Sequence, residues 1–432
     1  MNFYSLNRQS PAVDFKTATI NGQAPDKGLY FPEQIPQFGK DFFNNTHHHS
    51  PVELAFQMMQ PYVGESMAED KLYSIVEQTL NFPIPLVNVS QGISSLEMYH
   101  GNTLAFKDIG ARFMSRCLGH FVAEENRKVT VLVATSGDTG GAVADGFYGV
   151  DGVEVVILFP SGKVSSVQKK QLTTFGGNIR ALEVKGNFDD CQQMVKQAFA
   201  DQDIQSSLFL TSANSINAAR WLPQQFFYLM ACLQWPDKEH PPVISVPSGN
   251  FGNICAGLLA MCSGLPVQHF IAACNANDTV PQFMHSGVYE PRQAIPTISN
   301  AMDVGHPSNF VRILELFAQD RARLSSHFSA VSYSDEATRQ AISMVNAQHD
   351  YLMDPHGAVA YLAMKDYQLQ HPQSAGLFAE TAHPVKFYDV VEPVVGKKIP
   401  LPPAIEKIMD KPEIAQVIDP SFDTLKEYLL CV

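Results

Sequence analysis

The sequence predicts an α/β fold in which helices cover mainly parallel sheets. From residue 129 onward, short runs of apolar and β-branched residues alternate with segments of helical spacing. The runs are mainly apolar, as in strands that are buried on both faces of a parallel sheet. The chain has 432 residues, of which 45% are hydrophobic and 17% charged. At about 150 residues per domain, this length predicts roughly two or three domains.

The first 80 residues predict a separate, mostly helical N-terminal region, 1–80. A turn signal at Asn21-Gly22 comes first, and Ser50-Pro51-Val52-Glu53 then forms a capping box with proline at the first helical position. Residues 47–49 are histidines that precede this cap. We interpret them as part of a polar loop, because no other cluster of ligands accompanies them, and we predict no metal site.

Two α/β lobes follow, one at 81–225 and a larger one at 226–432. The first carries an amphipathic helix that starts near Lys107, where apolar side chains recur at i, i+3, i+4 and i+7. Near the C-terminus, the prolines within 400–403 predict a linker into a final helical tail. The expected strands are 129–134, 153–159, 179–184, 243–246 and 270–274.

Charge and cysteine content disfavour several classes of partner. With 30 Lys+Arg against 43 Asp+Glu, the net charge of -13 opposes binding to nucleic acids and to anionic membranes. Seven cysteines without a CxxC pair predict free thiols in a reducing cytoplasm. The first ten residues show no apolar signal segment, and the most apolar stretch, 255–274, is interrupted by Gly264-Leu265-Pro266. No membrane span is therefore predicted.

Two glycine-rich segments directly follow predicted strands and precede predicted helices, where ligands bind in open α/β sheets. They are 135–141, TSGDTGG, and 248–253, SGNFGN. Neither matches GxGxxG or a nucleoside-triphosphate loop, which disfavours NAD and ATP. Backbone N–H groups of the second loop suit a single phosphate monoester, and the hydroxyls of the first suit a carboxylate. A tight turn that serves packing alone remains the alternative.

Lys107 is badly placed for helix stability, because a cation in the first helical turn opposes the helix dipole. The same placement, together with partial desolvation, lowers the pKa of an amine and favours the neutral nucleophile that a Schiff base requires. A solvated surface lysine is the alternative interpretation of this residue taken alone. The combination of Lys107 with the two loops favours a catalytic role.

Four ordered motifs resemble those of fold-type II pyridoxal-phosphate enzymes, and most closely those of the threonine synthase family. The motifs are 102–108 (NTLAFKD), 135–140 (TSGDTG), 249–253 (GNFGN) and 381–387 (TAHPVKF). The segment 28–32, GLYFP, also resembles the branch of the family that has a longer N-terminal region. The resemblance covers most of the chain. It implies a tryptophan synthase β-like fold with two parallel-sheet lobes.

The resemblance implies pyridoxal 5'-phosphate as the cofactor, carried by Lys107 as a Schiff base. Thr381 is expected to face the pyridine nitrogen, which a neutral hydroxyl leaves largely unprotonated. Asp138 stands beside the phenolic oxygen, at a position where many relatives have asparagine, and its protonation state is open. The cofactor phosphate is expected to be held by Gly249, Asn250, Phe251, Gly252 and Asn253.

The same resemblance implies O-phospho-L-homoserine as the substrate, which water converts to L-threonine and phosphate. Once freed, Lys107 is expected to move protons at Cα and Cβ as general base and acid. Lys163 is a further candidate cation at the rim of the site, although a solvated loop lysine is equally compatible with its position. Ser136 and Thr139 are expected to bind the α-carboxylate, and Asn214, Ser215 and Arg220 the phosphate of the substrate.

Two other functions remain open at this point. A lyase acting on the same substrate releases phosphate and 2-oxobutyrate, and the motifs barely separate it from the synthase. A catalytically silent metabolite-binding relative is disfavoured by intact Lys107, Thr381 and both loops. For Arg112, on the helix after Lys107, an internal ion pair is favoured over a substrate contact. The protein is expected to be a monomer or a homodimer.

Overall fold

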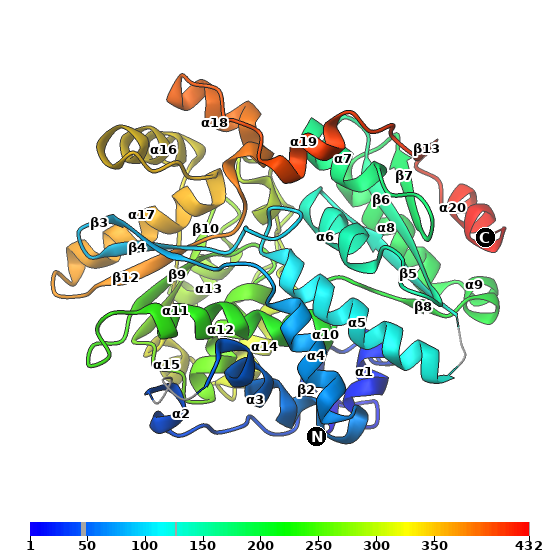
Figure 1. The fold of residues 1–432 in the computed structure, drawn as a ribbon, viewed down its shortest axis with the longest axis horizontal. Coiled ribbons are helices and arrows are strands. Elements are labelled where there is room, and N and C mark those ends of the chain that lie inside the picture. Colours follow the sequence, from blue (N-terminus) through cyan, green and yellow to red (C-terminus); the bar gives the residue numbers. More distant parts are fainter. Residues whose placement is uncertain (45–48, 126–127, 432) are drawn as a thin grey trace.

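The computed structural model describes residues 1–44, 49–125 and 128–431. Two α/β layers stand side by side, one built on a six-stranded and one on a five-stranded sheet, with the N-terminal region packed below both in the view of Figure 1. In spatial order, the six-stranded sheet contains β11 (Phe328–Ser332), β10 (His269–Cys274), β9 (Val243–Pro247), β12 (Gly376–Glu380), β4 (Ile93–Glu97) and β3 (Leu86–Ser90). The five-stranded sheet contains β13 (Ala415–Ile418), β7 (Ile179–Val184), β6 (Val153–Pro160), β5 (Val129–Ala134) and β8 (Leu210–Thr211).

Helices cover both sheets and the space between them. Around the five-stranded sheet lie α6 (Asp138–Phe147), α7 (Ser166–Thr173), α8 (Phe188–Ala200), α9 (Gln202–Ser207), α19 (Pro403–Met409) and α20 (Phe422–Leu430). The remaining helices after the N-terminal region are α5 (Lys107–Glu125), α10 (Ala218–Trp221), α11 (Gln225–Gln234), α12 (Gly252–Cys262), α13 (Thr279–Ser286), α14 (Phe310–Leu316), α15 (Arg321–Ser325), α16 (Asp335–His349), α17 (Pro355–Gln370) and α18 (Tyr388–Val395). Short 3-10 turns are η2 (Gly64–Ser66), η3 (Leu222–Gln224), η4 (Asn300–Met302) and η5 (Pro384–Phe387).

The N-terminal region is mostly helical, as predicted. It contains a two-stranded antiparallel sheet of β1 (Phe3–Ser5) and β2 (Tyr30–Pro32), with helices α1 (Phe15–Asn21), α2 (Lys40–Asn44), α3 (Pro51–Val63) and α4 (Glu69–Thr79). Ser50 and Glu53 form the predicted capping box at the start of α3. Of the histidines at 47–49, those at 47 and 48 lie outside the described residues.

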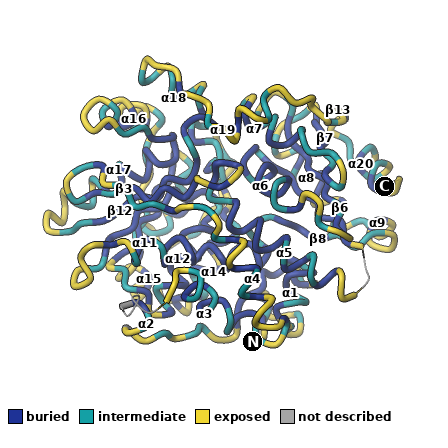
Figure 2. The backbone as a smooth tube through the Cα atoms, viewed as in Figure 1, coloured by how far each residue is buried: buried dark blue, intermediate teal, exposed yellow. Residues whose placement is uncertain are grey.

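The six-stranded and five-stranded sheets are parallel with one exception, and five of their strands match the predicted ones closely. β5 and β7 have the predicted bounds, and β6, β9 and β10 differ from them by one residue. The exception is β3, which pairs antiparallel with β4 and carries a register shift between Asn88 and Ser90. Every residue of β5, β9 and β10 is buried, which explains why each strand has only one polar residue (Figure 2).

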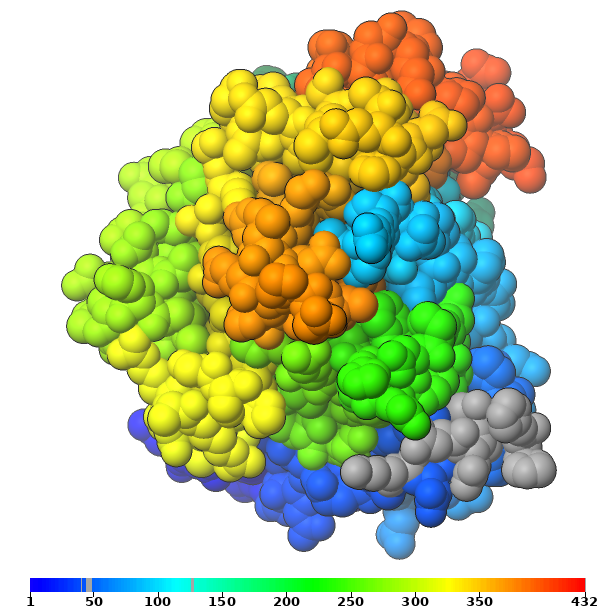
Figure 3. Space-filling model, turned by 90° about the vertical axis from the view of Figure 1, so that its left-hand side faces the viewer, coloured from blue at the N-terminus to red at the C-terminus, as the bar shows by residue number. Residues whose placement is uncertain are grey.

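The sheets do not follow the expected division of the chain at residues 80 and 225. β3 and β4 come from the expected first lobe, yet β4 pairs with β12 in the six-stranded sheet. In Figure 3 the surface near residue 91 accordingly touches the surface near residue 368. At the other end, the tail predicted as helical contains β13, which pairs with β7 in the five-stranded sheet. Each lobe therefore includes a segment of chain from the other half of the sequence.

Apolar packing joins the N-terminal region to the rest of the molecule. Phe15 of α1 packs edge-on against Phe113 and Phe121 of α5, with ring centroids 6.4 Å and 6.2 Å apart. All three side chains are fully buried, and each such burial contributes roughly 1.5–3 kcal/mol.

The seven cysteines are free thiols, and Cys431 is the exposed one. No helix in the described part of the chain is long and apolar enough to cross a bilayer.

Candidate active site

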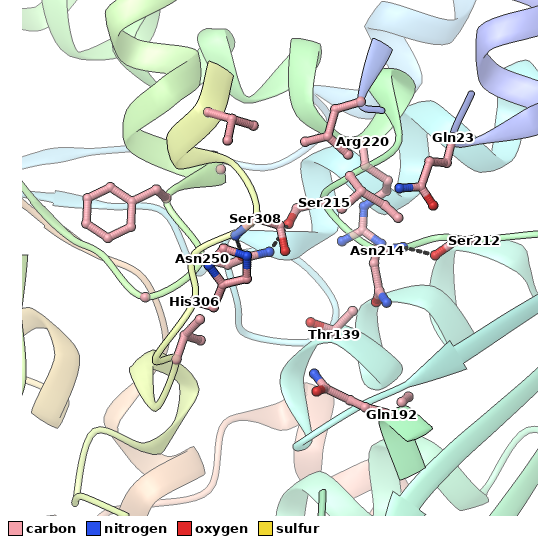
Figure 4. A pocket seen from close by; sticks show the side chains of 18 of the residues that line it. Gln23, Thr139, Gln192, Ser212, Asn214, Ser215, Arg220, Asn250, His306 and Ser308 are labelled. Atoms are coloured by element: carbon pink, nitrogen blue, oxygen red, sulfur yellow. Dashed lines mark hydrogen bonds between the residues drawn. The ribbon is translucent and has the colours of Figure 1, made fainter. Parts of the chain in front are cut away.

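The four sequence motifs meet because each follows the carboxyl end of a parallel strand. The lysine motif comes after β4, the TSGDTG loop after β5, the GNFGN loop after β9 and the TAHPVKF segment after β12. Carboxyl ends of parallel strands are where α/β sheets bind ligands. Here they surround a cavity of about 1410 Å³ that residues from both sheets line (Figure 4).

Almost all of the predicted site residues line this cavity. They are Lys107, Ser136, Asp138, Thr139, Asn214, Ser215, Arg220, Gly249, Asn250, Phe251, Gly252, Asn253 and Thr381. Lys163 is not among them, because it lies exposed on the loop after β6. The weakest of the substrate-binding candidates, Lys163, therefore does not line the cavity.

Lys107 is the first residue of α5, and its amine lies beside the cavity. The pKa of this amine is lowered to about 8, mainly by burial and also by the positive charges of Lys386 and Arg220, while the charge of Asp138 acts in the opposite direction. Lys107 forms no ion pair with any described residue. With a pKa of about 8, roughly a tenth of the amines are neutral at pH 7, against far fewer for an ordinary lysine.

Asp138 begins α6 and forms a buried ion pair that sequence reasoning missed. Nζ of Lys386 lies 2.9 Å from its Oδ1, and Nε2 of Gln168 donates to the same oxygen at 2.9 Å. Although burial raises the pKa of Asp138, the charges of Lys386 and Lys107 outweigh it and hold the pKa well below its usual value. Asp138 is therefore a carboxylate. The only signal in the sequence was the presence of a lysine inside the motif 381–387.

The lysine loop and the C-terminal motif are held together by backbone contacts. The N–H of Phe106 donates to the carbonyl of Thr381 at 2.9 Å, and Ala105 forms an antiparallel bridge with Ala382. Leu104 adopts a left-handed φ of 56° in the turn that leads to Lys107. These contacts fix Lys107 and Thr381 relative to each other before any ligand binds.

The GNFGN loop is built for close approach of an anion. It ends at the start of α12, whose N-cap residue, Phe251, has a left-handed φ of 61° and makes no side-chain capping bond. First-turn N–H groups of the helix thus remain available to a ligand. A Cβ on Gly249 would stand 2.5 Å from Cα of Met302, so only glycine fits there. The side chain of Asn250 is held by a residue outside the loop, because its Oδ1 accepts a hydrogen bond from the N–H of Ser308 at 2.6 Å.

Ser215 lies next to this loop. Its Oγ accepts from Nδ2 of Asn250 at 2.9 Å and from Nδ2 of Asn309 at 3.2 Å. Both donors leave the hydroxyl hydrogen of Ser215 free for another partner. The contact with Asn250, visible in Figure 4, joins Ser215 directly to the GNFGN loop.

Arg220 provides a buried cation with unused donors at another part of the cavity. One guanidinium N–H donates to the carbonyl of Ala213, but Nε is buried without a partner. Burial lowers the pKa of Arg220 to about 10, so the group stays charged at neutral pH. In Figure 4 Arg220 lies beside Asn214, Ser212 and Gln23. This arrangement suits an anion that arrives with a ligand.

The TSGDTG loop is shaped by Thr135, whose Oγ1 accepts from the N–H groups of Gly137 and Gly140 at 3.0 Å and 2.9 Å. Ser136 and Thr139 are half-buried and line the cavity at the start of α6.

Arg112, on α5, faces Asp145 at 3.8 Å, which is the internal ion pair favoured from the sequence.

Comparison with known proteins decides the family. A family model described as "Pyridoxal-phosphate dependent enzyme" matches residues 93–377, and models described as "Threonine synthase N terminus" and "Threonine synthase, C-terminal" match 2–80 and 357–429. The threonine synthases of Serratia marcescens and Escherichia coli are 43% and 41% identical to this chain, covering 100% of it and 99% of each relative. The chain belongs to the threonine synthase family.

Solved structures agree with this family. The crystal structure of threonine synthase from Escherichia coli matches with a TM-score of 0.93 at 40% identity, over 100% of both chains. A PLP-bound threonine synthase from Brucella melitensis matches with a TM-score of 0.93 at 33% identity, over 100% of this chain and 99% of that one. Maize serine racemase, with a TM-score of 0.56 and 17% identity, shares the fold alone over 72% of this chain and 92% of its own.

Family membership makes pyridoxal phosphate the cofactor, and the cavity fits it. Its phosphate requires free N–H groups and close backbone approach, which the GNFGN loop offers. Its aldehyde carbon requires an amine that is partly neutral and not engaged in an ion pair, which Lys107 offers. Thr381 is buried and lines the same cavity with its hydroxyl-bearing side chain. As a member of this family the chain is a PLP-dependent lyase.

Proposed function

We propose that this chain is a threonine synthase that converts O-phospho-L-homoserine and water to L-threonine and phosphate, with Lys107 as the cofactor-bearing and catalytic residue. The observation that carries the proposal is one cavity that unites Lys107, the GNFGN loop and the unpaired guanidinium of Arg220. A substrate with an amino-acid end and a phosphate end needs a site for each. The cavity holds both.

In this proposal the amino-acid end lies at the TSGDTG loop. The hydroxyls of Ser136 and Thr139, together with the N-terminus of α6, bind the α-carboxylate. The phosphate end lies at Arg220 and Asn214, where the buried Nε gains the partner that it lacks. Two anchors at opposite ends of the substrate fix its reacting carbons beside Lys107.

Lys107 moves the protons. When bound, pyridoxal phosphate supplies a sink for the electrons left on carbon when a proton is removed. The amine of Lys107, whose pKa is lowered to about 8, takes protons from Cα and Cβ of the substrate and later returns a proton to Cα. The phosphate then leaves Cγ with the bonding electrons and stays paired with Arg220, and Lys107 delivers a proton to Cγ. Water then adds at Cβ.

The test is a product assay with the purified protein. We expect phosphate and threonine in equal amounts from O-phospho-L-homoserine, and loss of both in Lys107→Ala. A dominant yield of 2-oxobutyrate would assign the chain to elimination instead. Binding of the cofactor without turnover of any amino acid would assign it to a silent binder. The proposal includes a cytoplasmic location, which the free cysteines support.

A further inference from the structure

A fully buried lysine stands behind the cavity and connects three of its segments. Lys386 belongs to η5, and its side chain has no exposed area. Its Nζ lies 2.9 Å from Oδ1 of Asp138 and donates to the carbonyl of Thr103 at 2.8 Å. Thr103 in turn donates its N–H to Asp108, next to Lys107, at 2.9 Å. Lys386 therefore contacts both the TSGDTG loop and the loop that presents Lys107.

The ion pair fixes one carboxylate oxygen and leaves the other free. Lys386 and Gln168 both bind Oδ1 of Asp138. Among the residues that the structure describes, no donor hydrogen-bonds to Oδ2, and Asp138 lines the cavity. A Cβ on Gly137 would stand 2.6 Å from Gln168, so this packing needs a glycine before Asp138. Oδ2 is thus available to a bound group.

We infer that Lys386 is a positioning residue that keeps Asp138 ionised and fixed, so that a carboxylate rather than a neutral acid faces the cofactor. The inference deepens the proposed function and rests on it, because it requires the cofactor in this cavity. A carboxylate accepts hydrogen bonds but donates none. Any group that contacts Oδ2 must therefore carry a proton or a positive charge.

The charges around the two groups support this role. Asp138 is faced by the cations Lys386 and Lys107 and by the neutral amide of Gln168, and together these outweigh the effect of burial on its pKa. Lys107 is faced by Asp138, Lys386 and Arg220. Without Lys386, Asp138 loses the largest of the influences that favour its charged form. Burial then moves its pKa toward the neutral range.

The experiment follows the visible absorption band of the holoenzyme as a function of pH. In Lys386→Met we expect a new transition between about pH 5 and 8, where a buried carboxyl without its cation titrates. Wild type should lack this transition, and so should K386M/D138N, in which the titrating group is gone. Lys398→Met is the matched control, since Lys398 pairs with Glu392 on the surface and is 91% exposed.

A second variant and a second measurement keep the inference testable if Lys386→Met folds poorly. Lys386→Gln keeps a donor for Asp138 but no charge, and it should show the same transition. In thermal unfolding, K386M and D138N should each lower Tm by more than the double variant does. An unchanged pH response in both Lys386 variants would overturn the inference. If the wild type has no Lys107-dependent absorption band, the proposed function fails. The Tm values of K386M, D138N and the double variant then decide whether Lys386 and Asp138 form an ion pair. Losses of Tm that simply add in the double variant would show that they do not.

Discussion

At the scale of single residues, burial and neighbouring charges set the protonation of Lys107. Its neutral form is the nucleophile, and the pKa of about 8 means that this form increases with pH up to that value. The rate of pyridoxal phosphate uptake by the apoprotein should therefore rise about tenfold per pH unit below pH 8 and level off above it. Stopped-flow absorbance measures this rate.

A matched variant sharpens the uptake measurement. Asp138 raises the pKa of Lys107, so Asp138→Asn should move the midpoint of the pH curve to lower pH. An uptake rate with a midpoint near that of an ordinary lysine, about 10.4, would contradict the account of Lys107.

Arg220 carries the second prediction at this scale. Lys presents a point charge and cannot reproduce the planar donors of the guanidinium. Arg220→Lys should lower kcat/KM for the phosphate ester by about 10- to 100-fold, or ~1.5–3 kcal/mol, the range for hydrogen bonds to charged groups. Cofactor affinity should change little. Arg180→Lys is the control, because Arg180 pairs with Glu154 on the surface at 3.4 Å. Equal effects in both variants would remove Arg220 from the substrate site.

Individual residues also mark the limit of what the sequence predicted. Lys107 and Asp138 were found because they lie in motifs that follow strands. Lys386 was inside a quoted motif but received no role, because sequence does not reveal that its amine meets Asp138 across 248 residues. Lys163 shows the opposite limit, because its place after a strand does not tell whether the side chain turns toward the cavity, and its exposed position fits the solvated loop lysine that was the alternative.

At the scale of elements, the GNFGN loop depends on the absence of a side chain. Gly249→Ala places a Cβ 2.5 Å from Cα of Met302 and 3.1 Å from the carbonyl oxygen of Ala301. Backbone rather than a flexible side chain must then move. We expect at least a tenfold loss of cofactor affinity, ~1.4 kcal/mol, in a titration of the apoprotein. Gly39→Ala meets no atom within 4 Å and should bind as wild type does. Unaltered affinity in G249A would separate this loop from the cofactor.

Predictability differed between elements for a physical reason. The central parallel strand β5 is buried at every residue and is apolar apart from Thr130, so its bounds were predicted. β7 was predicted from its four apolar residues, although it also carries Arg180 and Glu183. Outer strands have mixed patterns. β13 has two exposed residues among its four, and the prolines before it suggested a helical tail. β3 and β4 escaped prediction because polar residues interrupt both.

At the scale of the whole molecule, Arg312 ties the N-terminal region to the active site. Its guanidinium is fully buried and donates to the carbonyls of Tyr30, Ser215 and Ile216 at 2.9, 3.1 and 2.7 Å. It also stacks on Trp221, with Cζ 4.3 Å from the ring centroid. The segment around Ser215 therefore contacts the N-terminal region through Arg312, and also through Asn217, whose Nδ2 donates to the carbonyl of Thr19 at 2.9 Å.

Removing the guanidinium of Arg312 should destabilise both the N-terminal region and the segment around Ser215. Arg312→Met leaves three buried carbonyls without donors, so we expect a loss of more than about 3 kcal/mol of unfolding free energy. Denaturant unfolding measures it, and limited proteolysis should cut first in the N-terminal region. Arg339→Lys, at an exposed position, is the control. Equal stability of R312M and wild type would show that the N-terminal region is held by apolar packing alone.

The central claim is that Lys107 carries the cofactor in the cavity between the two sheets. Borohydride reduction of the loaded enzyme makes the carbon–nitrogen bond permanent, and mass spectrometry of the digested protein then locates the modified lysine. The account predicts the pyridoxyl group on Lys107. Modification of Lys386, Lys196 or Lys27 in its place would contradict it, because the first lies behind the cavity and the other two line it away from the predicted motifs.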